Sequence, residues 1–412
     1  MSLDPLDSIR AELAELTALG LRRRMRPIDG AQAAEVVVDG RRALNFSSNN
    51  YLGLADHPAL ATAALLSTQR DGFGAGASRL IAGSLAPHRA IERRIAGWLG
   101  TESALLFNSG FLANLGVITA LVGPRDEVFS DALNHASLID GCRLSRARVH
   151  VYPHGDTGAL ERALRASTAR RKLVVTDSVF SMDGDIAPIA ELVRLARAHG
   201  GLILCDEAHA IGALGPGGRG LAAGLDVDLV MGTLGKAFGT FGAFVAGAAP
   251  LIELLVHRAR SFVFSTALPS VVPAAATAAL SLIEGAEGEL RRTLLRHRCE
   301  QLHAGLRDLG LRPGAPSHIQ PIFVRDGDPE LAMAVSAALL ERGVFVQGIR
   351  PPTVPRGTAR LRLSLMSTHT QSQIDTALRA LATVREDLVP PEQLGVPILR
   401  SSVGPVIVAG GP

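Results

Sequence analysis

The sequence has few of the features that mark metal sites, disulfide frameworks or export. Its 412 residues include three cysteines, Cys142, Cys205 and Cys299. Their spacing is not that of metal ligands and they cannot all pair, which indicates a reducing compartment and predicts no metal site. The first 20 residues are acidic and lack a basic start and an apolar block, so we expect no signal peptide and a cytoplasmic protein.

Neither sign of charge dominates the composition, because 42 lysines and arginines stand against 39 aspartates and glutamates. The basic runs at 21–26, 169–172 and 291–298 are short, and runs of this kind are usually solvated helix faces. We therefore expect no nucleic acid partner.

One stretch resembles a membrane span by length. Residues 261–283 carry no charge and are long enough to cross a bilayer. Pro269 and Pro273 interrupt the stretch, and serines and threonines dilute it. We therefore expect a short strand, a turn and a buried helix there, and no membrane partner.

Short apolar runs rich in β-branched residues alternate with helical stretches through the first part of the chain. This alternation predicts a mainly parallel, seven-stranded sheet with helices on both faces. The runs are 103–108, 126–131, 148–154, 172–178, 201–207, 227–233 and 242–247.

The pattern changes after about residue 285, where a long polar helix, strands and a further helix predict a smaller α+β domain. We expect an N-terminal helix and arm at 1–45, a large domain at 46–284, the small domain at 285–387 and a tail at 388–412. The tail is rich in proline, glycine and small residues.

Nucleotide-binding fingerprints are absent. The glycine cluster at 72–84 follows a predicted helix end, whereas a G-x-G-x-x-G motif should follow a strand. Lys236 is followed by alanine, so "LGKAF" is not a P-loop. A dinucleotide-dependent oxidoreductase stays open as an alternative from a different class.

Two charged residues follow neighbouring predicted strands. "LILCDEAH" ends a strand at Asp206, and Lys236 comes after the next strand, among small and apolar residues with no charge until Glu253. In an α/β sheet, ligands bind beyond the carboxyl ends of strands, so both side chains can face one crevice. A desolvated lysine can form a Schiff base, and a buried aspartate can hold a pyridinium nitrogen protonated. This combination indicates pyridoxal 5'-phosphate (PLP).

Four longer motifs together resemble the α-oxoamine synthases, a family of fold-type-I PLP enzymes that condense an amino acid with an acyl-CoA. The motifs are "VVTDSVFSMDGDIAPI", "CDEAHAIGALGPGGRG", "GTLGKAFG" and "IRPPTVPRGTARLRLSL". The resemblance runs from about Leu21 to about Leu388. It implies the aspartate aminotransferase-like fold, PLP as cofactor, and amino acid and acyl-CoA substrates.

The resemblance also implies roles for individual residues. Lys236 resembles the Schiff-base lysine that removes the substrate's α-proton, and Asp206 resembles the partner of the ring nitrogen. His209 resembles the ligand of the cofactor's phenolic oxygen, and His135 the imidazole stacked on the pyridine ring. A surface lysine, a helix cap and structural histidines are the ordinary alternatives for these residue types.

Phosphate and substrate contacts follow from the same resemblance. Thr266 resembles a residue that reaches the cofactor phosphate of the neighbouring subunit, which implies a homodimer with shared active sites. The other residues that resemble phosphate or cofactor contacts are Ser109, Gly110, Phe111, Thr233 and Ser181. Those that resemble substrate contacts are Asn49, Arg360 and Arg362, of which Arg362 matches the arginine that binds the substrate carboxylate.

Within the family, the motifs favour the biotin-synthesis branch, which joins L-alanine to a pimeloyl thioester. Pro351 stands where 2-amino-3-ketobutyrate ligases and 5-aminolevulinate synthases tend to carry an aromatic residue. Asn50, Ala210, Phe241 and Phe244 depart from the biotin-branch pattern. A ligase, a 5-aminolevulinate synthase-like enzyme or a secondary-metabolite synthase using glycine or serine therefore stays an alternative.

Overall fold

The computed structural model describes residues 4–388, which form two compact units. The larger unit comprises residues 49–181 and 185–295, and the smaller unit residues 4–48, 182–184 and 296–388. The segment predicted as an N-terminal arm thus groups with the C-terminal part of the chain. Apart from Leu388, the predicted tail lies outside the described residues. Within 4–388, every helix is too short or too polar to cross a membrane.

The larger unit contains the predicted seven-stranded sheet, with the strand order β4-β10-β9-β8-β7-β5-β6. β10 is antiparallel to both of its neighbours, and the other strand pairs are parallel. The strands are β4 (Ser103–Phe107), β5 (Glu127–Asp131), β6 (Arg148–Tyr152), β7 (Lys172–Asp177), β8 (Leu202–Asp206), β9 (Leu229–Thr233) and β10 (Ala243–Gly247). Each of the seven predicted runs contains one of them.

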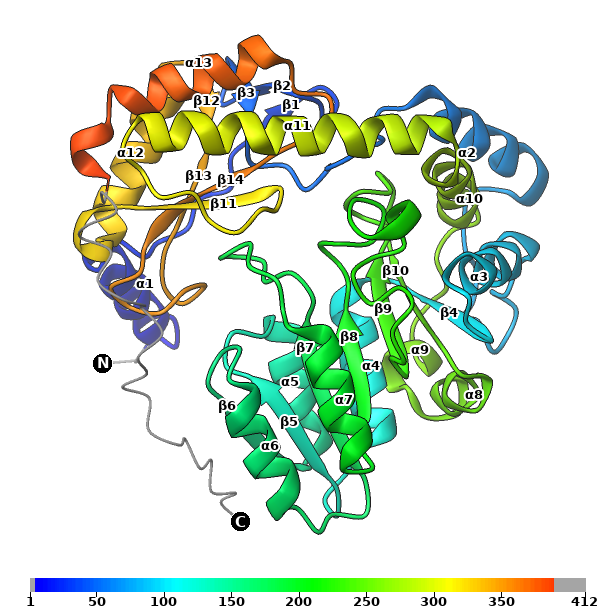
Figure 1. Cartoon of the computed structure of the whole chain (residues 1–412). Helices are drawn as coiled ribbons and strands as arrows, with labels where there is room; N and C mark the ends of the chain where they lie inside the picture. Colours follow the sequence, from blue (N-terminus) through cyan, green and yellow to red (C-terminus); the bar gives the residue numbers. More distant parts are fainter. Residues whose placement is uncertain (1–3, 389–412) are drawn as a thin grey trace. The chain divides into compact units, whose positions relative to one another are not determined.

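Alternate residues of these strands contribute to two separate apolar clusters, one on each face of the sheet. Leu204 belongs to the cluster that includes α4, α5, α8 and α9, whereas Ile203 and Cys205 belong to the cluster that includes α6 and α7. Successive side chains of a strand point to opposite faces, so both faces of the sheet are buried under helices (Figure 1).

Helices of the larger unit connect the strands and cover the sheet. They are α2 (Pro58–Asp71), α3 (Ala86–Leu99), α4 (Gly110–Leu121), α5 (Ala136–Ser145), α6 (Thr157–Ala166), α7 (Ile189–Ala198), α8 (Ala249–Arg258), α9 (Arg260–Val263) and α10 (Val271–Glu284). α2 and α10 lie against each other although about 200 residues separate them in sequence.

The strand expected at the start of residues 261–283 is wrong. One helical turn, α9, occupies this position, because Phe262 is buried against Phe107 with ring centroids 5.8 Å apart. The only strand-like contact of this stretch within the described residues is a single bridge between Thr266 and Ser78. The buried helix is confirmed as α10, in which Pro273 occupies the first turn, where its missing N–H is tolerated.

The smaller unit is an α+β structure with two small sheets. One sheet has the order β1-β2-β3-β12 and the other β11-β14-β13. The strands are β1 (Ile28–Asp29), β2 (Glu35–Val38), β3 (Arg41–Asn45), β11 (Ile319–Phe323), β12 (Val344–Phe345), β13 (Gln347–Ile349) and β14 (Arg360–Ser364). Its helices are α1 (Asp7–Ala18), α12 (Pro329–Glu341) and α13 (Gln371–Ala382), while α11 (Ala286–Asp308) contributes residues to both units.

Candidate active site

Three charged residues lie at or beyond the carboxyl ends of adjacent parallel strands in the larger unit. Asp206 is the last residue of β8, and Asp177, the last residue of β7, is paired with it in register. Lys236 follows three residues after the end of β9, the other neighbour of β8. These strand ends share one edge of the sheet, which is where open α/β sheets bind their ligands.

Buried hydrogen bonds hold the Asp206 carboxylate in place. Asp206 is 3% exposed, and one oxygen of its carboxylate accepts a hydrogen bond from the backbone N–H of Ala208 at 2.9 Å. The other oxygen accepts from Nδ2 of Asn114 at 2.7 Å. Asn114 is fully buried on α4 and also donates to Oγ of Ser137 at 2.9 Å. The side chain of Asn114 on α4 therefore holds the carboxylate of Asp206 in position.

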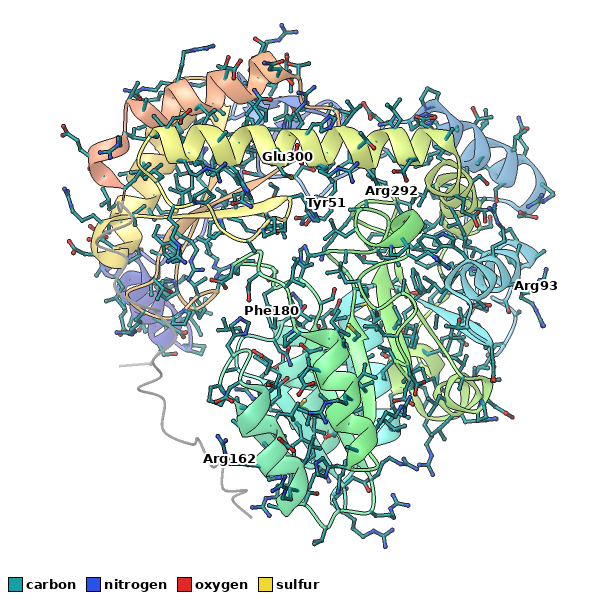
Figure 2. The ribbon with its side chains drawn as sticks, viewed as in Figure 1. Tyr51, Arg93, Arg162, Phe180, Arg292 and Glu300 are labelled. Atoms are coloured by element: carbon teal, nitrogen blue, oxygen red, sulfur yellow. The ribbon has the colours of Figure 1, made fainter. Side chains whose placement is uncertain are left out.

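Lys236 lies at one end of a chain of short polar contacts. Its Nζ is 2.9 Å from Nε2 of His209, and Nδ1 of the same ring is 2.7 Å from the hydroxyl of Tyr51. That hydroxyl donates to Oδ1 of Asn49 at 2.9 Å. Tyr51, labelled in Figure 2, has no exposed surface. The structure thus brings together the predicted residues Lys236, His209 and Asn49.

His135 and Asp177 add a second polar contact at this edge. His135 caps the N-terminus of α5, and its backbone N–H donates to the carboxylate of Asp177 at 2.7 Å. Although His135 keeps exposed surface, partial desolvation of its ring lowers the pKa, while the charge of Asp206 raises it and that of Lys236 lowers it further. Both charged groups therefore act on the imidazole. Burial, and then the charge of Asp206, raise the pKa of Asp177 well above its usual value.

Residues predicted to bind phosphate open α4, directly after β4. Ser109 caps this 12-residue helix, and its Oγ accepts from the backbone N–H of Leu112 at 3.3 Å. Gly110 and Phe111 are the first helical residues, so unpaired N–H groups of the first turn and the positive end of the helix dipole lie there. This geometry can bind an anion.

The remaining predicted cofactor contacts lie in the same unit. Thr233 donates from Oγ1 to the carbonyl of Gly242 at 3.1 Å, at the end of β9. Thr266 is exposed, and its carbonyl accepts from Nδ2 of Asn108 at 2.8 Å, one residue before Ser109. Ser181 is half-buried in the turn between Val179 and Ile186.

The two predicted substrate arginines lie on β14 of the smaller unit. Arg360 is 3% exposed, forms an ion pair with Asp183 and lies over the ring of Phe323 at 4.5 Å. Arg362 is 7% exposed and donates to Oγ of Ser364 at 2.7 Å. The guanidinium of Arg360 is thus used in contacts within its own unit, which favours Arg362 of the two as a ligand for a substrate carboxylate.

Three residues of the site were not among those predicted from the sequence: Tyr51, Asn114 and Asp177. Asp177 ends a strand as Asp206 does, so the same rule could have found it. Asn114 lies one helical turn after Gly110, but nothing in the sequence indicates that its amide reaches β8. Tyr51 belongs to the quoted "SSNNYLGL" motif, yet its contact with His209 joins residues 158 positions apart.

Two departures from the expected pattern have structural explanations. Asn50 accepts from the backbone N–H groups of Leu54 and Ala55 through Oδ1, a role that an aspartate would also fill. Phe244 is fully buried opposite Gly232, which has no side chain to compete for the space. Neither observation requires a different acyl chain.

Residues 41–381 match the family described as aminotransferase class I and II. The chain belongs to this family. Relatives named 8-amino-7-oxononanoate synthase cover nearly its whole length. That of Geobacter sulfurreducens is 51% identical, over 92% of this chain and 98% of the relative, and that of Anaeromyxobacter sp. strain K is 53% identical, over 95% and 99%.

Solved structures are also similar to this chain over most of its length. A serine palmitoyltransferase of Sphingomonas wittichii is 35% identical, with a TM-score of 0.86 over 94% of this chain and 98% of that chain. A high-resolution structure of SPT with PLP is 33% identical, with a TM-score of 0.87 over the same shares. An 8-amino-7-oxononanoate synthase of Francisella tularensis is 28% identical, with a TM-score of 0.71 over 84% and 98%.

These comparisons confirm four predictions at the level of the family. They are the resemblance to the α-oxoamine synthases, the PLP fold type I architecture, PLP as the cofactor and the assignment as a PLP-dependent acyltransferase. Together with the many further relatives of the same name, they favour the biotin-synthesis branch over the dinucleotide alternative.

Proposed function

We propose that this chain is an 8-amino-7-oxononanoate synthase that uses PLP to condense L-alanine with pimeloyl-CoA. The products are 8-amino-7-oxononanoate, CoA and CO2, and the reaction belongs to biotin biosynthesis. The observation that carries this proposal is the pair at adjacent strand ends, with Asp206 held by Asn114 and Lys236 by His209, in a chain about half identical to synthases of that name.

The chemistry of the donor set at this edge matches the parts of PLP. Lys236 offers an amine for the aldehyde, and Asp206 a buried carboxylate for the ring nitrogen. The capped start of α4 at Ser109 offers N–H groups for the phosphate. His135, which keeps exposed surface, would supply a ring for stacking. When bound, PLP supplies an electron sink that stabilises a carbanion next to the amino acid nitrogen.

The chain's own residues would then handle protons and charge. Nζ of Lys236 would accept the α-proton of the substrate and later return a proton to the same carbon. The carboxylate of Asp206, which accepts two hydrogen bonds, would hold the ring nitrogen of the cofactor. His209 supplies a ring N–H to the phenolic oxygen.

We assign recognition of the substrate carboxylate to Arg362, because the guanidinium of Arg360 already forms an ion pair with Asp183. A guanidinium can hold an amino acid carboxylate through two parallel hydrogen bonds. Asn49, which accepts from Tyr51 close to His209, would make a further substrate contact. As the carbonyl carbon of the thioester bonds to Cα, CoA would leave. The bond between Cα and the carboxylate would then break and release CO2, which opens the position on Cα that the returning proton takes.

A homodimer with shared active sites is part of this proposal. Thr266 would contact the cofactor phosphate of the neighbouring subunit. The Ser78–Thr266 bridge is flanked by Ile81 and Phe264, which are 82% and 71% exposed. Large exposed apolar side chains of this kind commonly mark a protein interface. Light scattering would test the dimer. Recovery of activity on mixing the inactive Lys236→Ala chain with an inactive Thr266 variant would test the sharing.

The serine palmitoyltransferase structures favour a second candidate, in which serine replaces alanine as the amino acid. Their identity of 33 to 35% is lower than the 51 to 53% of the 8-amino-7-oxononanoate synthases. The alanine-using function is therefore preferred.

The cytoplasm is the proposed compartment. Cys142, Cys205 and Cys299 are all unpaired thiols, and two of them are buried. Such thiols persist where the surroundings are reducing. Cell fractionation would test this assignment.

Cofactor attachment tests the site directly. The purified chain would be incubated with PLP, reduced with borohydride and digested, and the peptides analysed by mass spectrometry. The chain has two lysines, Lys172 and Lys236, so the result is unambiguous. We expect the label on Lys236 and none on the Lys236→Ala chain. A label on Lys172 alone, or no label, would refute the proposed site.

A further inference from the structure

Lys236, His209, Tyr51 and Asn49 form a series of hydrogen-bond contacts. The positions of the protons in this series follow from which atoms can donate and which can only accept. The carbonyl oxygen of an amide can only accept, so the single hydroxyl proton of Tyr51 goes to Oδ1 of Asn49, at 2.9 Å. The Tyr51 oxygen must then accept from Nδ1–H of His209, at 2.7 Å. In a neutral imidazole this leaves Nε2 without a proton, facing Nζ of Lys236 at 2.9 Å.

Burial fixes the position of the Tyr51 hydroxyl. The residue has no exposed surface, and its backbone N–H donates to the carbonyl of Asn49 at 2.8 Å. Asn50 holds the turn that follows by accepting from the backbone N–H groups of Leu54 and Ala55. Because ring and turn are both held, the hydroxyl is kept beside His209.

We propose that Tyr51 is a positioning residue that keeps His209 in the Nδ1–H tautomer, so that Nε2 can take a proton from Lys236. The inference rests on the proposed function, in which Lys236 must act as a neutral amine. It assigns to a buried tyrosine the control of whether the ring nitrogen that faces the lysine carries a proton.

The proton transfer balances without any further reactant. The Lys236 ammonium loses one proton and becomes an amine, and Nε2 of His209 gains it, so that the ring becomes an imidazolium. Nδ1–H of that imidazolium still donates to Tyr51, and this charge-assisted hydrogen bond is stronger than the one made by the neutral ring. The new Nε2–H is then a donor of the kind that the phenolic oxygen of PLP requires.

The chain supplies a matched control, because Tyr51 and Tyr152 are its two tyrosines. Tyr152 is also buried, at 3% exposure, but it lies on β6, and among residues 4–388 its hydroxyl has no hydrogen-bond partner at normal distance. Tyr51→Phe and Tyr152→Phe therefore make the same chemical change in two buried rings, one beside His209 and one elsewhere in the sheet.

The first measurement is the tautomer of His209 in the PLP-free protein, by nitrogen-15 NMR of labelled histidines. The His209 signal would be assigned by its loss in His209→Asn. We expect Nδ1 protonated and Nε2 bare in the wild type and in Tyr152→Phe, and an Nε2–H or mixed state in Tyr51→Phe. A wild-type ring with its proton on Nε2 would overturn the inference.

The second measurement is the rate at which borohydride fixes PLP on Lys236, as a function of pH. Tyr51→Phe should be about tenfold slower than the wild type at pH 7, the order expected for losing one hydrogen bond to a charged group. The gap should close at alkaline pH, where hydroxide removes the lysine proton instead. A gap that is the same at all pH values would indicate a merely structural role, and no gap at all would equally overturn the inference.

These outcomes separate the inference from the proposed function. A wild-type chain that never fixes PLP on Lys236 would refute the proposed function, while the tautomer measured without PLP would still stand as a property of the protein. A wild-type chain that fixes PLP normally, with Tyr51→Phe matching it in both measurements, would refute this inference alone.

Discussion

Replacing His154 should remove a pH-dependent part of the stability of the larger unit. Nδ1 of His154 is 2.9 Å from the carboxylate of Asp131 at the end of β5, and Nε2 is 2.6 Å from that of Asp185. The ring lies edge-on to Phe180, with the ring centroids 4.3 Å apart. Phe180 is labelled in Figure 2. Burial lowers the pKa of His154, but the two carboxylates outweigh it and raise the pKa to about 10.

The magnitude follows from this shift. A change in pKa from 6.5 to about 10 corresponds to roughly 5 kcal/mol at about 1.36 kcal/mol per unit. The side chain of Asp185 is 35% exposed, so water screens part of this interaction, and we expect about 3 kcal/mol. Because the folded-state pKa is raised, the stabilisation is fully present below pH 6.5 and is lost as the pH rises toward 10.

Urea unfolding of the wild type and His154→Gln at pH 6, 8 and 10, followed by circular dichroism, would measure this effect. The difference in the free energy of unfolding should be largest at pH 6 and shrink steadily to pH 10. The exposed His297→Gln is the matched control and should show no difference at any of these pH values. An effect of His154→Gln that is equal at pH 6 and pH 10 would refute the reasoning.

Two further predictions concern packing and acid stability. Gly232→Ala should lower the free energy of unfolding by about 1–3 kcal/mol, because its Cβ would stand 2.3 Å from Cζ of the buried Phe244. The control Gly235→Ala, with no atom closer than 3.7 Å, should cost less in the same urea titration, and equal costs would contradict the packing argument. Burial lowers the pKa of His369 to about 4, and its Nδ1 accepts from the backbone N–H of Met366 at 3.0 Å. Between pH 6.5 and about 4, His369 therefore gains a proton when the protein unfolds. The free energy of unfolding should fall by up to about 3 kcal/mol over that interval. Acid titrations of His369→Gln should lack this decrease.

The sheet could be predicted because its strands, apart from the partly exposed edge strand β6, are buried on both faces. Continuous apolar runs such as Leu229–Thr233 stand out from the amphipathic helices between them, and each ends close to a charged or turn residue. The segment at 261–283 was harder to interpret. An uncharged run of four residues fits one helical turn as well as a strand, and only the packing of Phe262 against Phe107 decides between them.

The site was predictable where its residues follow strands and not where they come from distant parts of the chain. Asp206 and Lys236 are identified by their place after neighbouring strands. Asn114 and Tyr51 act through contacts across 92 and 158 residues of sequence. A polar residue on a buried helix face, or a tyrosine in a turn, has the same local pattern whether or not it touches a catalytic group.

The most direct test of the proposed function is a product analysis with competing amino acids. The purified protein with PLP would be given equal concentrations of L-alanine, glycine and L-serine together with pimeloyl-CoA, and the products identified by mass spectrometry. We predict 8-amino-7-oxononanoate as the main product, with its formation abolished in Lys236→Ala. A main product derived from glycine or serine, or no condensation with pimeloyl-CoA while PLP is bound at Lys236, would contradict the proposed function.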